Sequence, residues 1–303
     1  MNEKIINDNL NKYCLFVSIL GRPNVGKSSL LNMLVNSKIS IVSPKSQTTR
    51  NRITGILTDD NTQLIFTDTP GVHKSLNKLG DYMNTEVNNS LSGAELCIHV
   101  VEAGKEISNT DLELINKFQK NNLKSVLIIN KIDLINKQDL IPQIQEFSQK
   151  FNYQSIIPVS AKKNIGRLEI LKELKKFAVP SVFFYPEDDI TDQTERKLSS
   201  EIIREKILYF LDKELPHGIG IYIENFKEFS NNTKNIHAVI YCEKESHKKI
   251  IIGTSGNMIK KIGTESRKSL ENILDSKVNL NLFVKVKENW RNKNSVLKIL
   301  GYI

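Results

Sequence analysis

A glycine-rich segment near the N-terminus carries the pattern G-x-x-x-x-G-K-S, from Gly21 to Ser28. An apolar run (15–20) precedes it and a helical stretch (28–35) follows. Backbone N–H groups of such a loop converge on phosphate at a helix N-terminus. Its lysine reaches the β- and γ-phosphate oxygens, and its serine hydroxyl ligates Mg²⁺. The segment therefore predicts a nucleoside triphosphate site in which Lys27 holds phosphate and Ser28 holds Mg²⁺.

The segment Asp68-Thr69-Pro70-Gly71 follows a second strand-like run and suits the same chemistry. An aspartate at a strand end after such a loop is expected to coordinate Mg²⁺, and the backbone N–H of Gly71 to approach the γ-phosphate. The intervening stretch 43–50 is polar and aperiodic. One of its threonines, Thr49 in preference to Thr48, is predicted to complete the Mg²⁺ shell while the γ-phosphate is present. The alternative is a solvated loop with incidental threonines.

Two further segments indicate which base is bound. Asn130-Lys131-Ile132-Asp133 follows the apolar run 125–129, which is typical of a buried parallel strand. The Asp133 carboxylate can accept two hydrogen bonds from guanine that adenine cannot donate. An unpaired buried carboxylate costs on the order of 1–3 kcal/mol, so ATP should be rejected. Ser160-Ala161-Lys162, after another strand-like run, can present a backbone N–H to guanine O6.

These segments together predict a guanine-nucleotide site. Its expected residues are Gly21, Arg22, Pro23, Asn24, Val25, Gly26, Lys27, Ser28, Ser29, Asp68, Thr69, Pro70, Gly71, Asn130, Lys131, Asp133, Ser160, Ala161 and Lys162. The predicted metal ligands are Ser28, Thr49 and Asp68.

Strand-like runs alternate with helical stretches over the first part of the chain, and each segment above follows the end of such a run. This order predicts an α/β domain with a mixed, mostly parallel sheet flanked by helices, which binds its ligand at the carboxyl ends of the strands. An acidic, turn-rich segment follows Pro180. We expect a first domain at 1–180, a linker at 181–193 and a smaller α+β domain at 194–303.

The second domain has a pattern of its own, helix–strand–strand–helix–GxxG–helix–strand, with the GxxG at Gly253-Thr254-Ser255-Gly256. This order matches a KH domain of the prokaryotic arrangement, whose glycine loop lets the backbone approach the phosphates of single-stranded RNA. Here Thr254 and Ser255 replace the Lys or Arg that many such loops carry. The following helix carries cations that are expected to supply positive charge, namely Lys260, Lys261, Arg267 and Lys268. The alternative for each lysine is a solvated helix face.

Composition agrees with a polyanionic partner. The 303 residues carry a net charge of +9, and residues 217–303 hold 15 Lys and Arg against 8 Asp and Glu. Three well-separated cysteines argue against a zinc site and for a reducing compartment. The N-terminus lacks the apolar core of a secretory signal, and no apolar run is long enough to span a bilayer. We expect a cytoplasmic monomer.

The first part of the chain resembles the Ras-like GTPases, and nearly the whole chain is similar to the Era family among them. The matching segments are GRPNVGKSSLLN (21–32), SPKSQTTRNRITG (43–55), DTPGVH (68–73), NKID (130–133), SAK (160–162), EIIREKIL (201–208), ELPHG (214–218), IIIGTSGNMIKKIG (250–263) and VKVKENWR (284–291). The resemblance implies a Mg²⁺-dependent GTPase that binds 16S-type ribosomal RNA near its 3′ end and acts in assembly of the small ribosomal subunit.

The same resemblance implies a slow enzyme. Many relatives have a glutamine after the D-x-x-G segment that orients the attacking water, whereas this chain has Val72. In some relatives an asparagine at the position of Asn24 helps to hold K⁺ between the β- and γ-phosphates, and the same is a hypothesis here. The residues expected to support catalysis are Lys27, Thr49, Gly71 and Asn24.

Two alternative functions share parts of this sequence pattern. A membrane-surface signalling GTPase would also have a basic tail, and would bind peripherally to the cytoplasmic face of the inner membrane. No basic amphipathic helix with a large apolar face favours that reading. A tandem-GTPase assembly factor is excluded because the chain has a single G-x-x-x-x-G-K-S segment.

Overall fold

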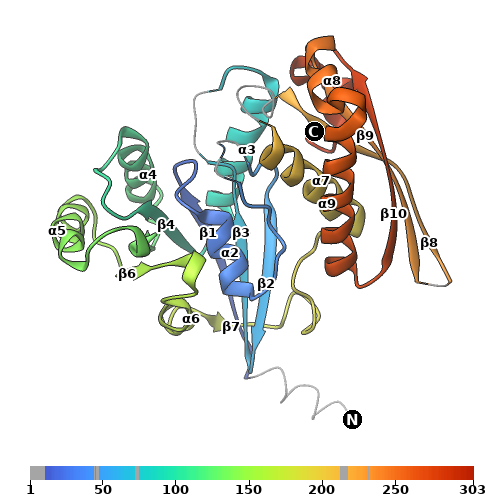
Figure 1. The fold of residues 1–303 in the computed structure, drawn as a ribbon. Helices are drawn as coiled ribbons and strands as arrows, with labels where there is room; N and C mark the ends of the chain where they lie inside the picture. Colours follow the sequence, from blue (N-terminus) through green and yellow to red (C-terminus); the bar gives the residue numbers. More distant parts are fainter. Residues whose placement is uncertain (1–10, 44, 46–47, 72–74, 212–217, 231) are drawn as a thin grey trace, which may run out of the picture. The chain divides into compact units, whose positions relative to one another are not determined.

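A computed structural model describes residues 11–43, 45, 48–71, 75–211, 218–230 and 232–303 (Figure 1). The chain divides into two compact units, and the main boundary falls between Asp192 and Gln193. Two short segments, 43–48 and 75–82, group with the second unit. Each unit has a β-sheet and a hydrophobic core of its own.

The first unit is built on a twisted sheet with the strand order β2-β3-β1-β4-β5-β6. Its strands are β1 (Tyr13–Gly21), β2 (Ile53–Asp59), β3 (Thr62–Asp68), β4 (Leu96–Glu102), β5 (Ser125–Asn130), β6 (Ser155–Val159) and the short β7 (Val179–Pro180). β2 runs antiparallel to β3, and β7 runs antiparallel to β1. The other neighbouring strands are parallel. The predicted mixed, mostly parallel sheet is confirmed.

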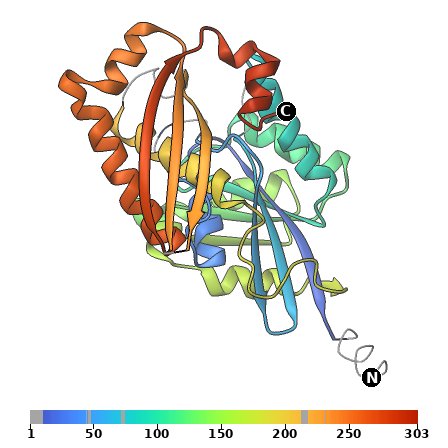
Figure 2. The same cartoon turned by 90° about the vertical axis from the view of Figure 1, so that its right-hand side faces the viewer.

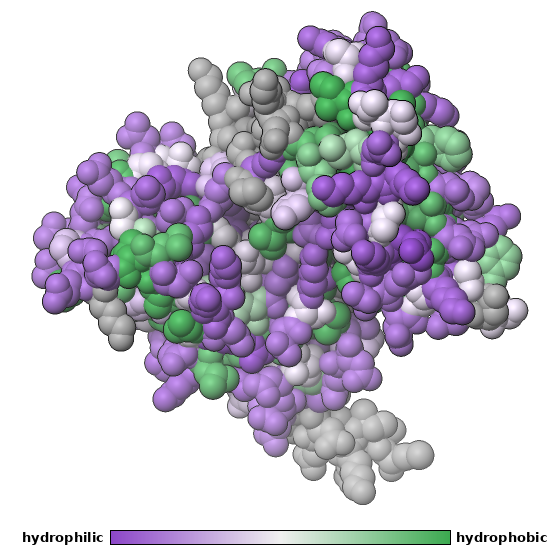
Figure 3. Space-filling view, in the orientation of Figure 1, coloured by the Kyte–Doolittle hydropathy of each residue, from purple (hydrophilic) through white to green (hydrophobic). Residues whose placement is uncertain are grey.

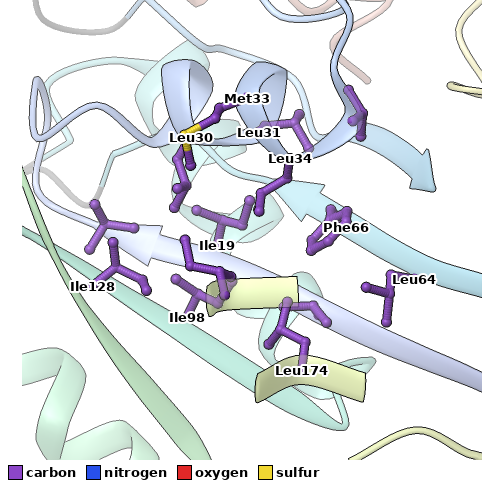
Figure 4. Close-up of a cluster of buried hydrophobic side chains, with 14 of the residues drawn as sticks. Ile19, Leu30, Leu31, Met33, Leu34, Leu64, Phe66, Ile98, Ile128 and Leu174 are labelled. Atoms are coloured by element: carbon purple, nitrogen blue, oxygen red, sulfur yellow. The ribbon is translucent and has the colours of Figure 1, made fainter. Parts of the chain in front are cut away.

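Helices cover both faces of this sheet, which explains its continuous apolar strands. They are α2 (Lys27–Val35), α3 (Lys78–Ser92), α4 (Asn109–Lys120), α5 (Leu140–Lys150) and α6 (Arg167–Lys175). In β5, Val126 and Ile128 join the core under α2 and α6, which is shown in Figure 4. Leu127 and Ile129 join the core on the opposite face, with α4 and α5.

The segment predicted to be a linker packs on the first unit as far as residue 192. The buried side chain of Gln63 accepts hydrogen bonds from the backbone N–H groups of Phe184 (2.9 Å) and Tyr185 (3.1 Å). Further along, the backbone N–H of Ile56 in β2 donates to the carbonyl oxygen of Ile190 (2.9 Å). This segment therefore covers the edge that β2 would otherwise expose.

The second unit has a three-stranded sheet with the order β10-β9-β8. Its elements are α7 (Glu195–Phe210), β8 (Gly220–Phe229), β9 (Thr233–Cys242), α8 (Glu245–Ile252), α9 (Asn257–Leu274), β10 (Lys277–Val286) and α10 (Asn294–Ile299). β9 pairs antiparallel with β8 and parallel with β10. The predicted order of elements is present, and α10 is an addition that the sequence pattern did not indicate.

One face of the second sheet packs against α7, α8 and α9, while Figure 2 shows the other face turned toward the viewer. After β10 the chain places Trp290, the single tryptophan, in a fully buried position. Its indole N–H donates to the carbonyl oxygen of Gly218 (2.9 Å).

Short 3-10 turns complete the chain at Ile132–Leu134, Lys137–Asp139, Ala161–Lys163, Thr254–Gly256 and Trp290–Asn292. The surface seen in Figure 3 is mostly hydrophilic, with hydrophobic side chains in scattered groups. In the part of the chain that is described, no helix combines the length and apolar character needed to cross a membrane.

Candidate nucleotide site and nucleic-acid groove

The phosphate loop joins the end of β1 to the start of α2, as predicted. Lys27 is buried there, and its ammonium group donates to the carbonyl oxygens of Gly21 (3.0 Å) and Arg22 (2.9 Å). Burial lowers the pKa of Lys27 to about 8, and the nearby charge of Asp68 opposes that shift. A buried cation at a helix N-terminus favours an anion, so the loop suits phosphate.

Asn130 fastens this loop to the segments predicted to bind the base. Its side-chain amide donates to the carbonyl oxygen of Val25 (2.8 Å) and accepts from the backbone N–H of Ala161 (3.0 Å). Gly26 has a φ of +99°, and a Cβ added there would lie 2.2 Å from the Asn130 amide nitrogen. Only glycine fits this close approach without strain.

The three predicted metal ligands lie together at the carboxyl edge of the sheet. The Ser28 hydroxyl donates to Oδ2 of Asp68 (2.7 Å) and lies 2.8 Å from the Thr49 hydroxyl. Ser40, which the sequence analysis did not single out, donates to the same oxygen (3.1 Å). Burial raises the pKa of Asp68, while the charge of Lys27 and these hydroxyl groups act against the rise.

This group of oxygen atoms fits Mg²⁺, which prefers hard oxygen ligands in octahedral geometry. One carboxylate oxygen of Asp68, Oδ1, is buried and has no hydrogen-bond partner among the described residues. Such an atom is costly to bury without a partner, and a cation would satisfy it. Ser40 has no signal in the sequence, because only the fold brings it to Asp68.

The structure also separates the two threonines of the predicted mobile loop. The Thr48 hydroxyl donates to the carbonyl oxygen of Lys45 (2.6 Å), whereas the Thr49 hydroxyl lies near Oδ2 of Asp68 (3.5 Å). Of the two threonines, Thr49 is therefore the one whose hydroxyl lies beside the Asp68 carboxylate. Gly71 lies against the phosphate loop, where an added Cβ would be 2.8 Å from the backbone nitrogen of Pro23.

Among the segments predicted to bind the base, Asp133 is exposed, although a buried carboxylate was expected at this position from the sequence. The 3-10 turn at Ile132–Leu134 projects it beyond the sheet. The Ser160 hydroxyl donates to Oδ1 of Asp133 (2.5 Å) and lowers the pKa of that carboxyl group. Lys131 is in the left-handed region (φ 69°) and its ammonium group pairs with Glu102 (2.7 Å). Val72 lies outside the described residues.

A buried charged group that sequence reasoning missed adjoins the loop. Asp111, at the start of α4, lies 3.2 Å from Nε of Arg22 and 3.4 Å from Nε2 of His99. The Tyr153 hydroxyl lies 2.7 Å from Nδ1 of His99.

The remaining predicted contacts differ in exposure. Asn24 is exposed with a φ of 65°, and Lys162 is exposed in the 3-10 turn after β6. Ser29 is half-buried, whereas Thr69 is buried and its hydroxyl donates to the carbonyl oxygen of Ile19.

The second unit has a groove of about 330 Å³ between α9 and β10. Its lining consists of Ile259, Lys260, Gly263, Thr264, Arg267, Leu280 and Leu282. An apolar floor with two cations is the chemistry that single-stranded nucleic acid requires, because bases need apolar contact and phosphates need charge.

The GxxG loop lies directly before α9, and its side chains Thr254 and Ser255 are exposed. Gly253 has a φ of +74°, and an added Cβ would lie 2.6 Å from Cβ of Met258. Gly256 also has positive φ, but an added Cβ there meets nothing within 4 Å. Gly253 therefore shapes the loop, while Gly256 leaves its outer surface open to a ligand.

Two of the predicted cations, Lys260 and Lys261, lie on different sides of α9. Lys260 lines the groove, whereas the ammonium group of Lys261 lies over the Phe210 ring of α7, 4.5 Å from its centroid. Arg267, two helical turns after Lys260, takes the second cationic position in the groove. Arg267 was also expected from the sequence to supply charge, and it shares a helix face with Lys260 because positions 260, 263, 264 and 267 follow the helical period.

Comparisons with known proteins find relatives for both units. Residues 16–131 match the family model described as 50S ribosome-binding GTPase, and residues 209–291 match the KH domain model. The chain is 47% identical to GTPase Era of Ruminiclostridium cellulolyticum over 95% of this chain and 96% of that protein. It is 45% identical to GTPase Era of Clostridium kluyveri over 95% of this chain and 98% of that protein.

Two solved structures are similar over nearly the full length. A variant of Aquifex aeolicus Era bound to GDP·AlF4⁻ is 35% identical, with a TM-score of 0.92 and coverage of 96% of this chain and 99% of that one. Era in complex with MgGDPNP and nucleotides 1506–1542 of 16S ribosomal RNA is 36% identical, with the same TM-score and coverage.

The fold and the site define a P-loop GTPase whose nucleotide-binding domain is followed in the sequence by a KH domain. More narrowly, the chain belongs to the Era family of GTPases.

Proposed function

We propose that this GTPase binds single-stranded RNA near the 3′ end of 16S-type ribosomal RNA and acts in assembly of the small ribosomal subunit. The observation that carries the proposal is the apolar, basic groove next to the GxxG loop, in a chain that also has the nucleotide site. The Era structure that contains nucleotides 1506–1542 of 16S ribosomal RNA supports the choice of RNA.

In the nucleotide site, Lys27 and the loop backbone would hold the β- and γ-phosphates, and Ser28, Thr49 and Asp68 would hold Mg²⁺. When bound, Mg²⁺ would neutralise negative charge on the phosphate oxygens. Gly71 lies against the same loop, and its backbone N–H would contact the γ-phosphate. Because Thr49 belongs to a segment predicted to be mobile, loss of the γ-phosphate would release it and change the RNA-binding state.

We also propose that turnover is slow and depends on K⁺. Val72 has no group that can orient water, so another source of charge stabilisation is needed. Asn24 in the phosphate loop would share a K⁺ with the phosphates. Hydrolysis measured in KCl should exceed hydrolysis in NaCl, and Asn24→Ala should remove the difference. Equal rates of the unchanged protein in both salts would contradict the K⁺ proposal.

The RNA assignment is tested at Gly256, because a side chain there meets open space rather than the protein. Gly256→Asp places a negative charge where RNA phosphate would approach the loop. We expect RNA affinity to fall at least about tenfold while GTP hydrolysis is unchanged. The measurement is a fluorescence binding titration with this organism's own counterpart of the 16S segment, with GDPNP and Mg²⁺ present.

Gly256→Asn is the matched control, since it introduces the same backbone strain without charge. Equal RNA affinity of the Asp variant and the unchanged protein would refute the groove as the RNA site. Cosedimentation with anionic liposomes in the same buffer tests peripheral membrane contact, and sedimentation velocity tests the proposed monomer. Binding to liposomes without binding to RNA would favour the membrane-surface alternative.

A further inference from the structure

The three-stranded sheet of the second unit has a face without a helix over most of its area, shown toward the viewer in Figure 2. We call this the outer face. It consists of the side chains of β8, β9 and β10 that point away from α7 and α9. A solvated sheet face is normally polar. This one has instead a row across its middle in which a buried valine lies between two aromatic residues.

The pairing register of the three strands determines which side chains lie next to one another in rows across the outer face. Tyr222 pairs with Val239, and Val239 pairs with Phe283, so these three side chains form one row across the sheet. Phe283 is 52% exposed although it lies on a regular strand. An exposed ring of this size on a rigid sheet is a stacking surface for a planar partner.

The next rows are rich in amides. Asn225, His237 and Asn281 form the adjacent row, and Asn235 pairs with Asn279 in the row beyond it. The Asn279 amide donates to Asn235 (2.8 Å), which orients both side chains. Amide groups can donate to and accept from the edges of nucleic-acid bases. The rows therefore combine stacking and hydrogen-bonding groups.

Charge on this face favours a polyanion. Lys227, Lys277 and Lys285 are exposed on β8 and β10, and the exposed acid on the described strands of this face is Glu224, at the irregularity between Ile223 and Asn225. Lysines at the edges of an aromatic surface match a strand whose phosphates run outside its stacked bases.

The outer face is also continuous with the groove. β10 is an edge strand, and Leu280 and Leu282 line the groove while Asn281 and Phe283 between and beyond them lie on the outer face. A strand of RNA in the groove therefore lies along the same edge from which the outer face begins. No other strand separates the two surfaces.

We propose that the outer face is a second binding surface for single-stranded RNA, on which nucleotides that flank the groove-bound segment stack on Phe283 and Tyr222. The proposal rests on RNA binding in the groove as the first surface. It predicts that RNA length matters: a short RNA contacts the groove alone, and a longer one contacts both surfaces.

The test compares the full-length protein with Phe283→Ala and Phe283→Tyr. The probes are this organism's counterpart of nucleotides 1506–1542 of the 16S RNA and a series of the same RNA shortened stepwise from each end. We expect Phe283→Ala to weaken binding of the long RNA about fivefold or more, as for the loss of one stacked base. The short RNAs should bind unchanged, and Phe283→Tyr should retain full affinity. Unchanged GTP hydrolysis and melting temperature check the fold.

Several outcomes would overturn the proposal. Equal effects of Phe283→Ala on long and short RNAs, or no effect on either, would do so. A change in sedimentation of the RNA-free protein would instead assign the face to contact between copies of the chain, and a change in liposome binding would assign it to lipid. Failure of the groove is distinguishable, because Gly256→Asp would then leave the short RNAs unaffected.

Discussion

Asn130 and Asp133 lie three residues apart in one motif but have different environments and different contacts. Asn130 is buried and joins the phosphate loop to the 160–162 segment, so its contribution is to the shape of the site. Asp133 is exposed and holds one hydrogen bond, from Ser160. We therefore expect base selectivity to depend on Asp133, and substitution at the two positions should have different consequences.

Asp133→Asn should change base preference without loss of fold. The carboxylate accepts two hydrogen bonds from guanine, and each charge-assisted bond contributes about 1.5 kcal/mol or more. GDP affinity should fall on the order of 100-fold. Xanthosine diphosphate should bind more tightly than it does to the unchanged protein, because an amide can donate to its 2-oxygen. Competition titrations with the two nucleotides measure both changes.

Ser160→Ala is the control for this experiment. It removes the hydroxyl that orients Asp133 and leaves the carboxylate in place. It should weaken GDP modestly and leave the preference for guanine intact. A switch toward xanthine in Ser160→Ala would contradict the assignment of selectivity to the Asp133 carboxylate.

At the scale of elements, β4 and α4 are joined by a buried ionisable pair. His99 of β4 lies among the rings of Phe118, Phe147 and Tyr153, and burial lowers its pKa, while Asp111 opposes the shift. Burial alone would raise the pKa of Asp111, but hydrogen bonds from His99 and Ser108 outweigh it, so the net shift is downward. His99 is therefore a core residue whose two ring nitrogens both have hydrogen-bond partners.

Stability should fall on acidification because of His99. The unfolded chain protonates this residue near pH 6.5, above its pKa in the folded protein, so the unfolded state binds more protons below that pH. The His99 contribution is fully present above about pH 6.5 and is lost as pH falls through the folded pKa, with a slope of at most about 1.4 kcal/mol per pH unit. Urea unfolding followed by circular dichroism between pH 5 and 8 gives this slope.

His99→Gln should reduce the slope in that window, although the variant is less stable throughout. Asp111 does not interfere, since its lowered pKa places its own loss of stability at lower pH, below the ordinary range of an aspartate. An identical pH profile in His99→Gln would show that other groups control acid sensitivity.

At the scale of the whole molecule, the first compact unit ends later in the sequence than composition indicates. The acidic, turn-rich composition after Pro180 is typical of a free connector, but the segment to Asp192 belongs to the first unit. Its backbone groups form hydrogen bonds with the buried side chain of Gln63 and with the backbone N–H of Ile56 at the edge of β2. A fragment that ends at 180 would remove the hydrogen bonds that the 181–192 segment makes with the Gln63 side-chain oxygen and with the backbone N–H of Ile56.

A fragment of residues 1–192 should therefore be more stable than a fragment of residues 1–180. Several buried hydrogen bonds are lost in the shorter fragment, at about 1–3 kcal/mol for each group left without a partner. We expect a lower melting temperature and a greater tendency to aggregate for 1–180, measured by thermal unfolding with GDP and Mg²⁺. Equal melting temperatures would show that the 181–192 segment is only a connector.

Much of this structure could be predicted from local patterns in the sequence. A short pattern with a recognisable flanking strand or helix indicates the phosphate loop, the Asp68 and Asn130 segments and the GxxG loop. Residues joined only by the fold left no such pattern. Ser40 reaches Asp68 across the chain, and Gln63 looks like an ordinary strand residue, although its amide holds a segment more than a hundred positions away.

The position of Trp290 has a practical consequence. It is the single tryptophan of the chain and lies buried in the second unit, with its indole hydrogen-bonded to Gly218. Light absorbed at the red edge of the protein spectrum therefore excites that unit alone. Its emission can report unfolding of the KH domain while a labelled nucleotide reports the other domain in the same cuvette. The order in which the two halves lose structure can thus be observed without attaching a dye to either.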